Sequence, residues 1–577
     1  MSPKATLSID AFPVWARFND VEFINAKLQE TNGKGIGLVT ASSLTITPAS
    51  EKATEVDISE NREVQGTVIE GQEDERARRE IQGQTNHNST KLLQIPHDLV
   101  LSATAIEEYT KVDQNFRQLI DSAGHQSTRG DILIYLLTHL VLSTRKESSP
   151  RGPASTPWTE YLKFLPRHVP VPTMWSEVER ALLQGTSLEA ALDAKFAALN
   201  KEFDELQEKS ADLPFWNSLF WEKETVTIKE WVLVDAWYRS RCLELPRAGH
   251  AMVPGLDMAN HSHAPTAYYD EDDKDNVVLL ARPGAAVSAG EEVNISYGEK
   301  PPAEMLFSYG FIDSESTVEG LTLPLRVLPD DPLGKAKLHI FKGPPSLKLS
   351  RLGGGISWHS PFVYLMCLNE EDGMEFRVLQ KEDGGRELKL FWQDEDVTTR
   401  ADGFEDLIKD HPLCQIFRLR VVSVLHEVVS DHLMQLSSEI SHEQLEPLRR
   451  AGLVRDDRLQ TVERLRGIES GVLEGVAAAL DEQVRLIKRA LFPSHKSMSM
   501  DLNDIASMAK SPGSLTILAC CNVPLSPPVP RVHVVHGTRA WPVCTSRTRL
   551  SIFPRFLFIA PDTPLVSPQR PRDLLRI

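Results

Sequence analysis

The segment DMANHS at residues 257–262 carries the most chemical information in this sequence of 577 residues. It places an aspartate, an asparagine and a histidine close together, and these side chains can bind a ligand or move a proton. Upstream lie GKGIGLV (33–39) and YRSR (238–241), and downstream lie ISYGE (295–299) and SYGF (308–311). Taken singly, each segment is weak evidence, because a GxG pattern is more often a tight turn than a cofactor cradle. The order and spacing of the five segments are therefore more informative than any one of them.

Together, in this order, the segments resemble those of the SET-domain protein methyltransferases. Within that family they are similar to the branch that includes the plant Rubisco large-subunit methyltransferase and its animal and fungal relatives. DMANHS matches the D-x-x-N-H-S motif, ISYGE with the later YGF matches the C-terminal tyrosine motif, and GKGIGLV matches the first cofactor-binding turn. The resemblance covers residues 12–325 and extends more loosely over 326–492.

The resemblance implies an α+β fold. We expect a SET-domain β-fold with knot-like C-terminal threading and a helical insertion, followed by a mostly α-helical C-terminal domain and a disordered tail. The expected boundaries are 1–325 for the SET domain, 326–492 for a helical domain similar to the family's substrate-binding domain, and 493–577 for a Pro-rich tail of low order. Within the first part, 51–90 is predicted to be a disordered insertion and about 104–244 the helical insertion.

The residue patterns agree with this division. Residues 12–47 have the composition of short strands and turns, and residues 51–90 contain no aromatic residue, ten acidic residues and five basic residues, a composition typical of disorder. Residues 182–209 combine strong helix formers with apolar spacings of three and four, which predicts a helix. Beyond residue 324 helices are expected to dominate. The tail from Pro512 has eleven prolines in 66 residues and no clear periodicity, so no function is assigned to it.

The resemblance implies S-adenosyl-L-methionine as cofactor. Glycines 35 and 37 have no side chain, so backbone groups of residues 34–36 can approach a ligand closely. Arg241, the second arginine of YRSR, matches the family's cofactor-contacting arginine, and a guanidinium suits a carboxylate partner. The expected cofactor-binding residues are Lys34, Gly35, Ile36, Arg241, Asn260, His261 and Tyr297.

Tyr297 is the expected catalytic residue. By the resemblance, its hydroxyl lies beside the methyl group and the incoming nitrogen and orients that nitrogen. It is not expected to act as a strong base, because an ordinary tyrosine has a pKa near 10. Tyr309 and Phe311 are expected to form walls of the substrate channel. Tyr268 or Tyr269 could face the substrate, and the sequence does not choose between them.

Charge and composition narrow the partners. The chain carries a formal net charge of −18, and an acidic surface repels nucleic-acid phosphates and attracts basic polypeptides. We therefore expect a protein substrate and no nucleic acid. We also expect a monomer and, because no nuclear localisation cluster is seen, a cytoplasmic location, with the nucleus in addition as an alternative. No apolar run approaches the roughly 20 residues that span a bilayer, so no membrane association is expected, and neither is a secretory signal. The HxH at His261 and His263 lacks further ligands for a metal site.

Three functions remain open from the sequence. The first is a protein-lysine N-methyltransferase acting on a non-histone protein. The second keeps the enzyme and changes the acceptor to a histidine, which at least one member of this branch uses. The third is a SET-fold adaptor without turnover, which damage at the motif residues would have favoured. Because those residues are intact, we expect an enzyme.

Overall fold

The computed structural model describes residues 6–31, 33–45, 90–144, 153–222, 226–316, 318–352, 355–380, 384–437 and 442–491. The chain divides into two units, Met1–Ala509 and Lys510–Ile577, and every described residue belongs to the first unit. The 51–90 insertion, apart from Thr90, and the 493–577 tail lie outside the described residues, so the predictions about them stay predictions. The domain boundaries given above also stay predictions.

The N-terminal part begins with a helix and continues as short strands. Its elements are the 3-10 turn η1 (Ile9–Ala11), α1 (Phe12–Phe18), β1 (Glu22–Phe23), β2 (Ala26–Thr31), β3 (Gly35–Thr40), β4 (Leu44–Thr45) and β5 (Lys91–Ile95). The prediction of strands and turns from residue 12 onward is wrong for α1. Its Pro13 occupies the first turn, where the missing N–H costs nothing, and Phe12 and Trp15 are buried in the main core.

Between β5 and residue 243 the described part of the chain is mostly helical. Its elements are η2 (His97–Leu99), α3 (Ala103–Val112), α4 (Gln114–Ala123), α5 (Thr128–Ser143), α6 (Pro157–Tyr161), η3 (Pro172–Met174), α7 (Glu177–Ala181), α8 (Leu188–Ala211), α9 (Pro214–Trp216), η4 (Asn217–Trp221) and α10 (Ile228–Arg241). Local sequence defines the start of α10, where Thr227 and Glu230 form a reciprocal capping box. Helix α5 is buried along the whole stretch 132–141, which explains why its sequence is apolar on all sides.

The chain then returns to short strands. These elements are β6 (Leu243–Leu245), β7 (Gly249–Ala251), η5 (Leu256–Met258), β8 (Ala267–Glu271), β9 (Val277–Ala281), β10 (Ala286–Val287) and α11 (Pro302–Tyr309). Strands from both sides of the insertion pair with each other in an antiparallel sheet of order β1-β5-β9-β8. In its register Gln94 lies opposite both Glu22 and Val278. Smaller antiparallel pairs join β2 with β3, β4 with β10, and β6 with β7.

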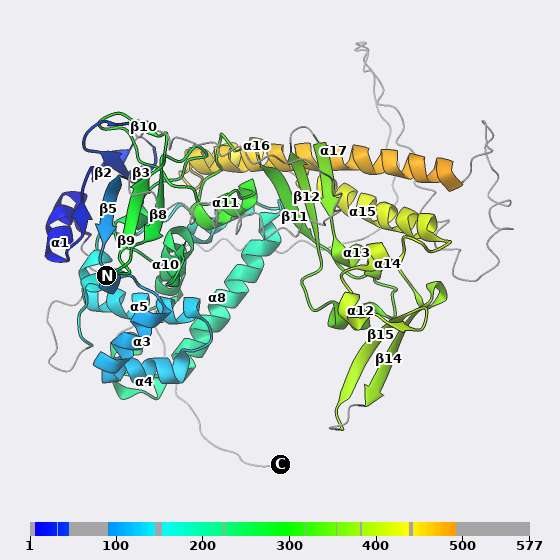
Figure 1. Ribbon diagram of the computed structural model, residues 1–577, viewed down its shortest axis with the longest axis horizontal. Coiled ribbons are helices and arrows are strands. Elements are labelled where there is room, and N and C mark those ends of the chain that lie inside the picture. The colour runs from blue at the N-terminus through cyan, green and yellow to red at the C-terminus, as the bar shows by residue number, and fades with distance from the viewer. Residues whose placement is uncertain are drawn as a thin grey trace, which may run out of the picture. The chain divides into compact units, whose positions relative to one another are not determined.

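The C-terminal part contains more strand than the sequence indicated. Its elements are β11 (Glu319–Pro324), α12 (Gly334–Phe341), β12 (Ser346–Leu352), β13 (Gly355–His359), α13 (Pro361–Met366), η6 (Glu370–Asp372), β14 (Met374–Gln380), β15 (Arg386–Trp392), β16 (Glu395–Asp396), η7 (Thr398–Arg400), α14 (Phe404–Leu407), α15 (Cys414–Leu436), α16 (His442–Arg450) and α17 (Asp456–Leu491). Helices and strands both occur here, and two three-stranded sheets, β11-β12-β13 and β14-β15-β16, were missed. Figure 1 shows the first sheet and α15 beside the long helix α17.

Three clusters of buried apolar side chains hold these parts. The first surrounds α5 and α10 with the β1-β5-β9-β8 sheet, and the second lies between the β11-β12-β13 sheet, α13, α15 and α17. The third joins Leu306 of α11 and Leu182 to Val462 and Leu465 of α17. Near this third cluster the buried carboxylate of Glu469 accepts hydrogen bonds from Ser187. Helix α17 therefore contacts both the N-terminal and the C-terminal parts.

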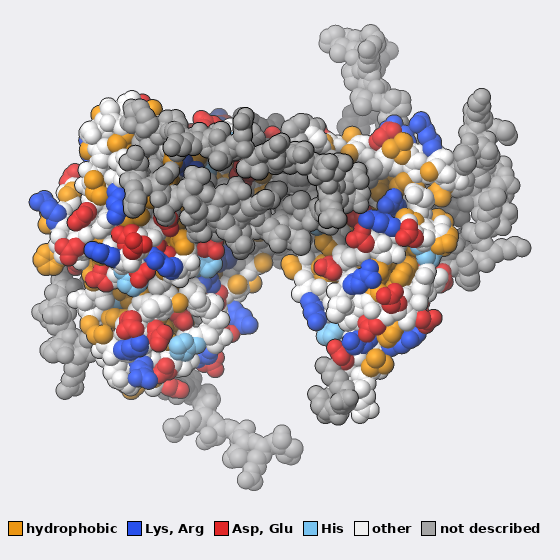
Figure 2. Space-filling model, viewed as in Figure 1, with side chains coloured by type: hydrophobic (Ala, Val, Ile, Leu, Met, Phe, Trp, Pro, Cys, Tyr) orange, Lys and Arg blue, Asp and Glu red, His pale blue; other side chains and the backbone are white. Residues whose placement is uncertain are grey.

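Acidic and basic side chains alternate over the surface seen in Figure 2, with no large patch of one sign among the described residues on that face. No helix in the described part of the chain has both the length and the apolar character needed to cross a bilayer.

Candidate active site

The β2–β3 hairpin forms one wall of the candidate site. Gly35 begins β3 with a φ of +79°, and an ideal Cβ there would meet nothing within 4 Å, so the backbone at the turn is openly accessible. Gly37 differs, because an ideal Cβ would lie 2.7 Å from Nδ2 of Asn260 and 2.8 Å from Oε1 of Glu292. A side chain at residue 37 would therefore displace Asn260, and the second glycine of GKGIG is needed for packing within the protein.

Asn260 is held by a residue that the sequence analysis missed. Its Nδ2 donates a hydrogen bond of 2.6 Å to Oε1 of Glu292, and the other carboxylate oxygen of Glu292 lies 3.2 Å from Nζ of Lys34. Glu292 thus links two predicted cofactor-binding residues that are far apart in sequence. The only sequence signal was that Glu292 lies three residues before ISYGE, which does not by itself reveal this contact.

Residues 260–262 run beside residues 295–297. His261 and Ile295 form a parallel bridge, and the Ile295 amide donates to the Asn260 carbonyl at 3.0 Å. Nδ1 of His261 accepts a hydrogen bond from the Tyr297 amide at 3.1 Å, and its Nε2 lies 3.4 Å from Oδ2 of Asp313. Because Nδ1 accepts, we assign the proton of the neutral ring to Nε2. Burial lowers the pKa of His261 despite the nearby Asp313.

Four rings form what we call the aromatic cluster: His261, Tyr297, Tyr309 and Phe311. The centroids of Tyr297 and Tyr309 are 4.6 Å apart, and those of His261 and Tyr297 are 5.2 Å apart. Phe311 lies 6.1 Å from His261 and 6.4 Å from Tyr309. The structure thus brings together the predicted catalytic residue and both predicted wall residues.

The hydroxyl of Tyr297 donates a hydrogen bond of 2.8 Å to the carbonyl of Ala259. Burial raises the pKa of Tyr297 well above its ordinary value. Burial also raises the pKa of Tyr309, to about 12. Both phenols therefore keep their protons at neutral pH.

The turn after α11 directs Tyr309 and Phe311 toward each other. Between them, Gly310 closes the helix with a φ of +85°, and an ideal Cβ at this position would lie 2.6 Å from the backbone carbon of Pro170. Both the left-handed conformation and the close approach require glycine.

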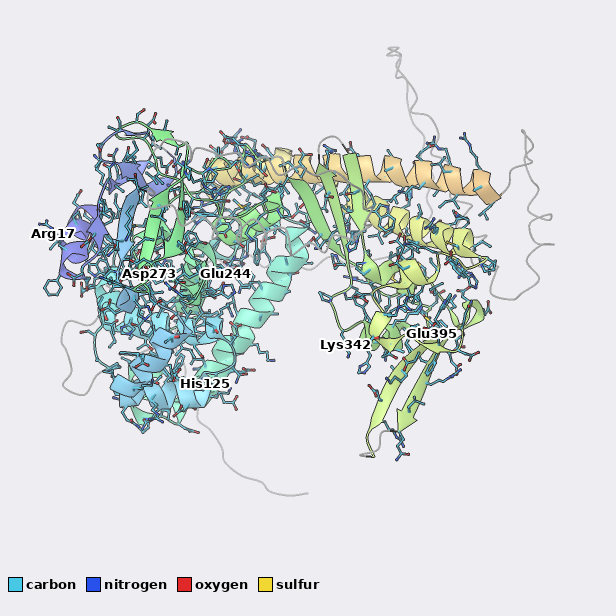
Figure 3. All side chains as sticks on the ribbon, in the orientation of Figure 1. Arg17, His125, Glu244, Asp273, Lys342 and Glu395 are labelled. Atoms are coloured by element: carbon cyan, nitrogen blue, oxygen red, sulfur yellow. The ribbon has the colours of Figure 1, made fainter. Side chains whose placement is uncertain are left out.

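Arg241 ends α10 and points to the start of DMANHS. Its Nη1 donates to the Asp257 carbonyl at 2.9 Å and lies 3.5 Å from Oδ2 of the same residue. The other carboxylate oxygen of Asp257 accepts hydrogen bonds from the Tyr161 hydroxyl and the Gly255 amide. Burial raises the pKa of Asp257, although Arg241 opposes the shift. In Figure 3, Glu244 on the following strand β6 marks this end of α10.

This pair retains unused hydrogen-bonding capacity. Nε of Arg241 and Oδ2 of Asp257 are buried and have no hydrogen-bond partner in the described part of the chain. The charges of Arg241 and Asp257 both act on the Tyr297 phenol, so the pair lies near the aromatic cluster. Asp257 and Tyr161 were absent from the predicted site, although Asp257 is the first residue of DMANHS.

The two alternative substrate-facing tyrosines lie on β8, where successive side chains point to opposite faces. The guanidinium of Arg282 lies over the Tyr268 ring, 5.9 Å from its centroid. Tyr269 packs against the same core cluster as Tyr297. Tyr269 therefore lies on the face of β8 that packs against the first core cluster, against which Tyr297 also packs. The substrate role of either tyrosine stays a prediction.

A cavity of about 60 Å³ opens beside His261, and its lining includes His263, Ser296, Lys300 and Asp313. Among the described residues, no group of three His, Cys, Asp or Glu side chains is arranged to hold a metal ion. The site thus combines an accessible glycine turn, a fixed amide, a neutral imidazole and protonated phenols. Such a set can bind and align reactants, and it includes no side chain placed as a strong nucleophile.

Comparison with curated proteins gives relatives among methyltransferases. The chain is 27% identical over 349 residues to SET domain-containing protein 8 of Schizosaccharomyces pombe, covering 59% of this chain and 76% of that protein. It is 28% identical over 192 residues to the chloroplastic [fructose-bisphosphate aldolase]-lysine N-methyltransferase of Arabidopsis thaliana, covering 32% and 39%. It is 23% identical over 238 residues to the actin-histidine N-methyltransferase of Xenopus tropicalis, covering 37% and 38%. The matches to the plant and frog proteins thus span about two fifths of those proteins.

Solved structures show the same fold. A structure of Rubisco LSMT bound to AdoMet aligns with a TM-score of 0.56 and 18% identity, covering 88% of this chain and all of that chain. No family model matches the sequence. The relatives and the shared fold, found for a chain that brings DMANHS and ISYGE together around one aromatic cluster, identify it as a homologue of the SET-domain protein methyltransferases, among them those that methylate the Rubisco large subunit.

Proposed function

We propose that this protein is an S-adenosyl-L-methionine-dependent protein N-methyltransferase that acts on a lysine of a non-histone protein. The observation that carries the proposal is the position of Tyr297, whose hydroxyl is anchored on the Ala259 carbonyl and whose ring contacts His261 and Tyr309. The lysine-methyltransferase relative from Arabidopsis supports the choice of acceptor.

The residues present fit the cofactor. The backbone of residues 34–36 is open at Gly35, and the unused Nε of Arg241 is a donor suited to a carboxylate. The Asn260 Nδ2 already donates to Glu292 and Thr31, so the amide oxygen is the group that this residue can offer, as an acceptor. We propose that residues 34–36, Arg241, Asn260 and His261 bind the cofactor. When bound, S-adenosyl-L-methionine supplies a methyl carbon activated by an adjacent positive sulfur.

Alignment is the main contribution of this chain to the reaction. Orientation of two reactants contributes roughly 7–11 kcal/mol in well-oriented model reactions. Two hydrogen bonds fix Tyr297, because its backbone amide donates to Nδ1 of His261 and its hydroxyl donates to the carbonyl of Ala259. Its hydroxyl oxygen retains a lone pair that can accept an N–H from the incoming amine and so orient it.

The acceptor lysine must be uncharged to react, and an unperturbed lysine has a pKa near 10.4. The partly buried rings of Tyr297, Tyr309 and Phe311 exclude water from the approach. Desolvation disfavours the charged ammonium and lowers its pKa. The neutral His261 forms part of the same wall and is not itself needed as a base.

A histidine acceptor is the second candidate, and the actin-histidine N-methyltransferase relative favours it. Mass spectrometry of lysine and histidine methylation in cells with and without this gene separates the two acceptors. A methylated histidine that disappears with the gene would replace lysine in the proposal.

The primary test of the proposal is cofactor binding by calorimetry, followed by tritium transfer from labelled S-adenosylmethionine to whole-cell extract. We expect saturable binding and at least one labelled protein band that depends on Tyr297. Binding without a labelled band would favour the third function, an adaptor without turnover. A monomeric state, an absence of nucleic acid and a cytoplasmic or nuclear location are parts of the same proposal.

A further inference from the structure

A second and larger cavity lies in the C-terminal part, within residues 326–492, which were expected to resemble a substrate-binding domain but for which no binding residue was predicted. Its volume is about 330 Å³, within the range of small-molecule and side-chain sites. It lies between β13, the start of α13, the segment leading into α14, and the second half of α17. We call it the acidic pocket, after the residues described next.

Two aromatic rings and two carboxylates line the acidic pocket. Trp358 and Tyr364 are stacked with centroids 6.3 Å apart and an interplanar angle of 29°. Asp402 and Glu405 supply the carboxylates, and the lining as the structure describes it includes His359 but no lysine or arginine. Two cations act on the lining from outside it, because Arg418 acts on the Tyr364 phenol and Lys409 interacts with Glu405. The pocket therefore favours a positively charged occupant.

A buried hydroxyl in the pocket lacks a partner. Ser360 is only 3% exposed, and its Oγ has no hydrogen-bond partner among the described residues. A buried polar group without a partner costs roughly 1–3 kcal/mol, so an occupant with an N–H group would relieve this cost. Aromatic faces, carboxylates and a free hydroxyl acceptor together match a guanidinium or ammonium group on an aliphatic stem.

We infer that the acidic pocket binds a basic side chain, arginine or lysine, of the polypeptide that the enzyme methylates, at a point separate from the transfer site. That the bound polypeptide is the substrate rests on the proposed function. Helix α17 connects the two places, since Leu465 packs in the cluster that contains Leu306 of α11, whereas Ala479 and Gln483 line the pocket. Fourteen helical residues rise about 20 Å, a span that an extended polypeptide covers in about six residues.

The test uses the full chain and the peptide acetyl-Gly-Gly-Arg-Gly-Gly-amide, with its norleucine analogue as the uncharged comparison. Arginine is chosen because the proposed transfer site takes lysine. By calorimetry we expect saturable binding of the arginine peptide, weaker by about tenfold for the norleucine peptide and for the double variant Asp402→Asn/Glu405→Gln. The control Glu474→Gln, on α17 outside the pocket lining, should bind the arginine peptide as the wild type does.

Both carboxylates are exposed, so the double variant should fold, and a thermal unfolding curve verifies this. Equal binding of the two peptides, or unchanged binding by the double variant, would overturn the inference. Affinity for S-adenosylhomocysteine is measured on the same samples and should be equal in the wild type and the double variant. If the wild type did not bind S-adenosylhomocysteine at all, the proposed function would be wrong. Failure of the pocket inference and failure of the proposed function therefore give different results.

Discussion

The candidate active site and the acidic pocket differ in the chemical groups that form them. In the active site, backbone groups and short polar contacts dominate, as when Ala259 and Asn260 present their carbonyls to Tyr297 and Ile295. In the acidic pocket, side chains of Trp358, Tyr364 and Glu405 provide most of the chemistry. Backbone contacts are set by the fold and tolerate little displacement, whereas a side-chain pocket can change its contacts gradually. We therefore expect substitutions in the active site to have abrupt effects and substitutions in the pocket to have graded ones.

The broadest effect is expected for Gly37→Ala, which should change both cofactor affinity and stability. The new methyl group would overlap Nδ2 of Asn260 and the carboxylate of Glu292, so Asn260 must move. We expect affinity for S-adenosylhomocysteine to fall at least about tenfold and stability to fall by about 1–3 kcal/mol, as for other overpacked sites.

Gly467→Ala is the matched control, because its ideal Cβ meets nothing within 4 Å on the helix α17. Alanine there should raise stability by about 0.5–1 kcal/mol and leave cofactor binding intact. Unchanged cofactor affinity in Gly37→Ala would contradict the arrangement around Asn260.

Tyr297→Phe should have a large effect on the rate of methyl transfer alone. It removes one hydroxyl and its bond to Ala259 while the ring stays in the cluster. We expect the rate of methyl transfer at saturating substrate to fall about a hundredfold through loss of alignment, with cofactor affinity nearly unchanged. Tyr309→Phe serves as the control and should lower the rate less. A full rate for Tyr297→Phe would remove its catalytic role.

Acid should weaken the N-terminal core more than the C-terminal one. His139 on α5 is fully buried, and burial lowers its pKa to about 3. The unfolded chain takes up this proton below about pH 6.5, but the folded chain does not, so stability falls by about 1.4 kcal/mol per pH unit between those values. Burial also lowers the pKa of His432 on α15, so hydrogen exchange should show both helices losing protection in acid, with α5 losing more.

In His139→Gln, which cannot titrate, the acid dependence of α5 should be reduced, whatever the absolute stability of the variant. The control variant is His426→Gln, at a position on α15 near Asp481. In this variant the acid dependence of α5 should stay as in the wild type. Identical slopes in both variants would show that another group titrates.

The smallest effect is expected for Gly475→Ala on α17. The added methyl would overlap Cδ1 of Ile356, which is the flexible end of a side chain that lines the acidic pocket. Displacement of Ile356 into the pocket should weaken binding of the arginine peptide by about fivefold, roughly 1 kcal/mol, without a change in cofactor affinity. Stronger or equal peptide binding would indicate that Ile356 moves away from the pocket.

Much of the fold could be predicted from the sequence where local signals act. The helical insertion was expected at about 104–244 and the structure has helices from Ala103 to Arg241, because helix formers, caps and apolar spacing are local properties. The sheets β11-β12-β13 and β14-β15-β16 were missed. In β14 the exposed Val378 and Leu379 are adjacent, so the alternation that identifies a strand is absent. Helix α1 was missed because seven residues are too few for a clear period.

The sequence by itself determined the chemical identity of the site, since the residues of DMANHS, ISYGE and YGF carry the amide, the imidazole and the phenols. Only the tertiary structure decided how they meet. Glu292 joins Lys34 across 258 positions of the chain, and Gly37 makes room for Asn260 across a strand pair. The acidic pocket likewise joins Trp358 to Gln483 through the packing of α17. Contacts of this kind depend on the three-dimensional approach of distant segments, for which a single sequence has no local signal.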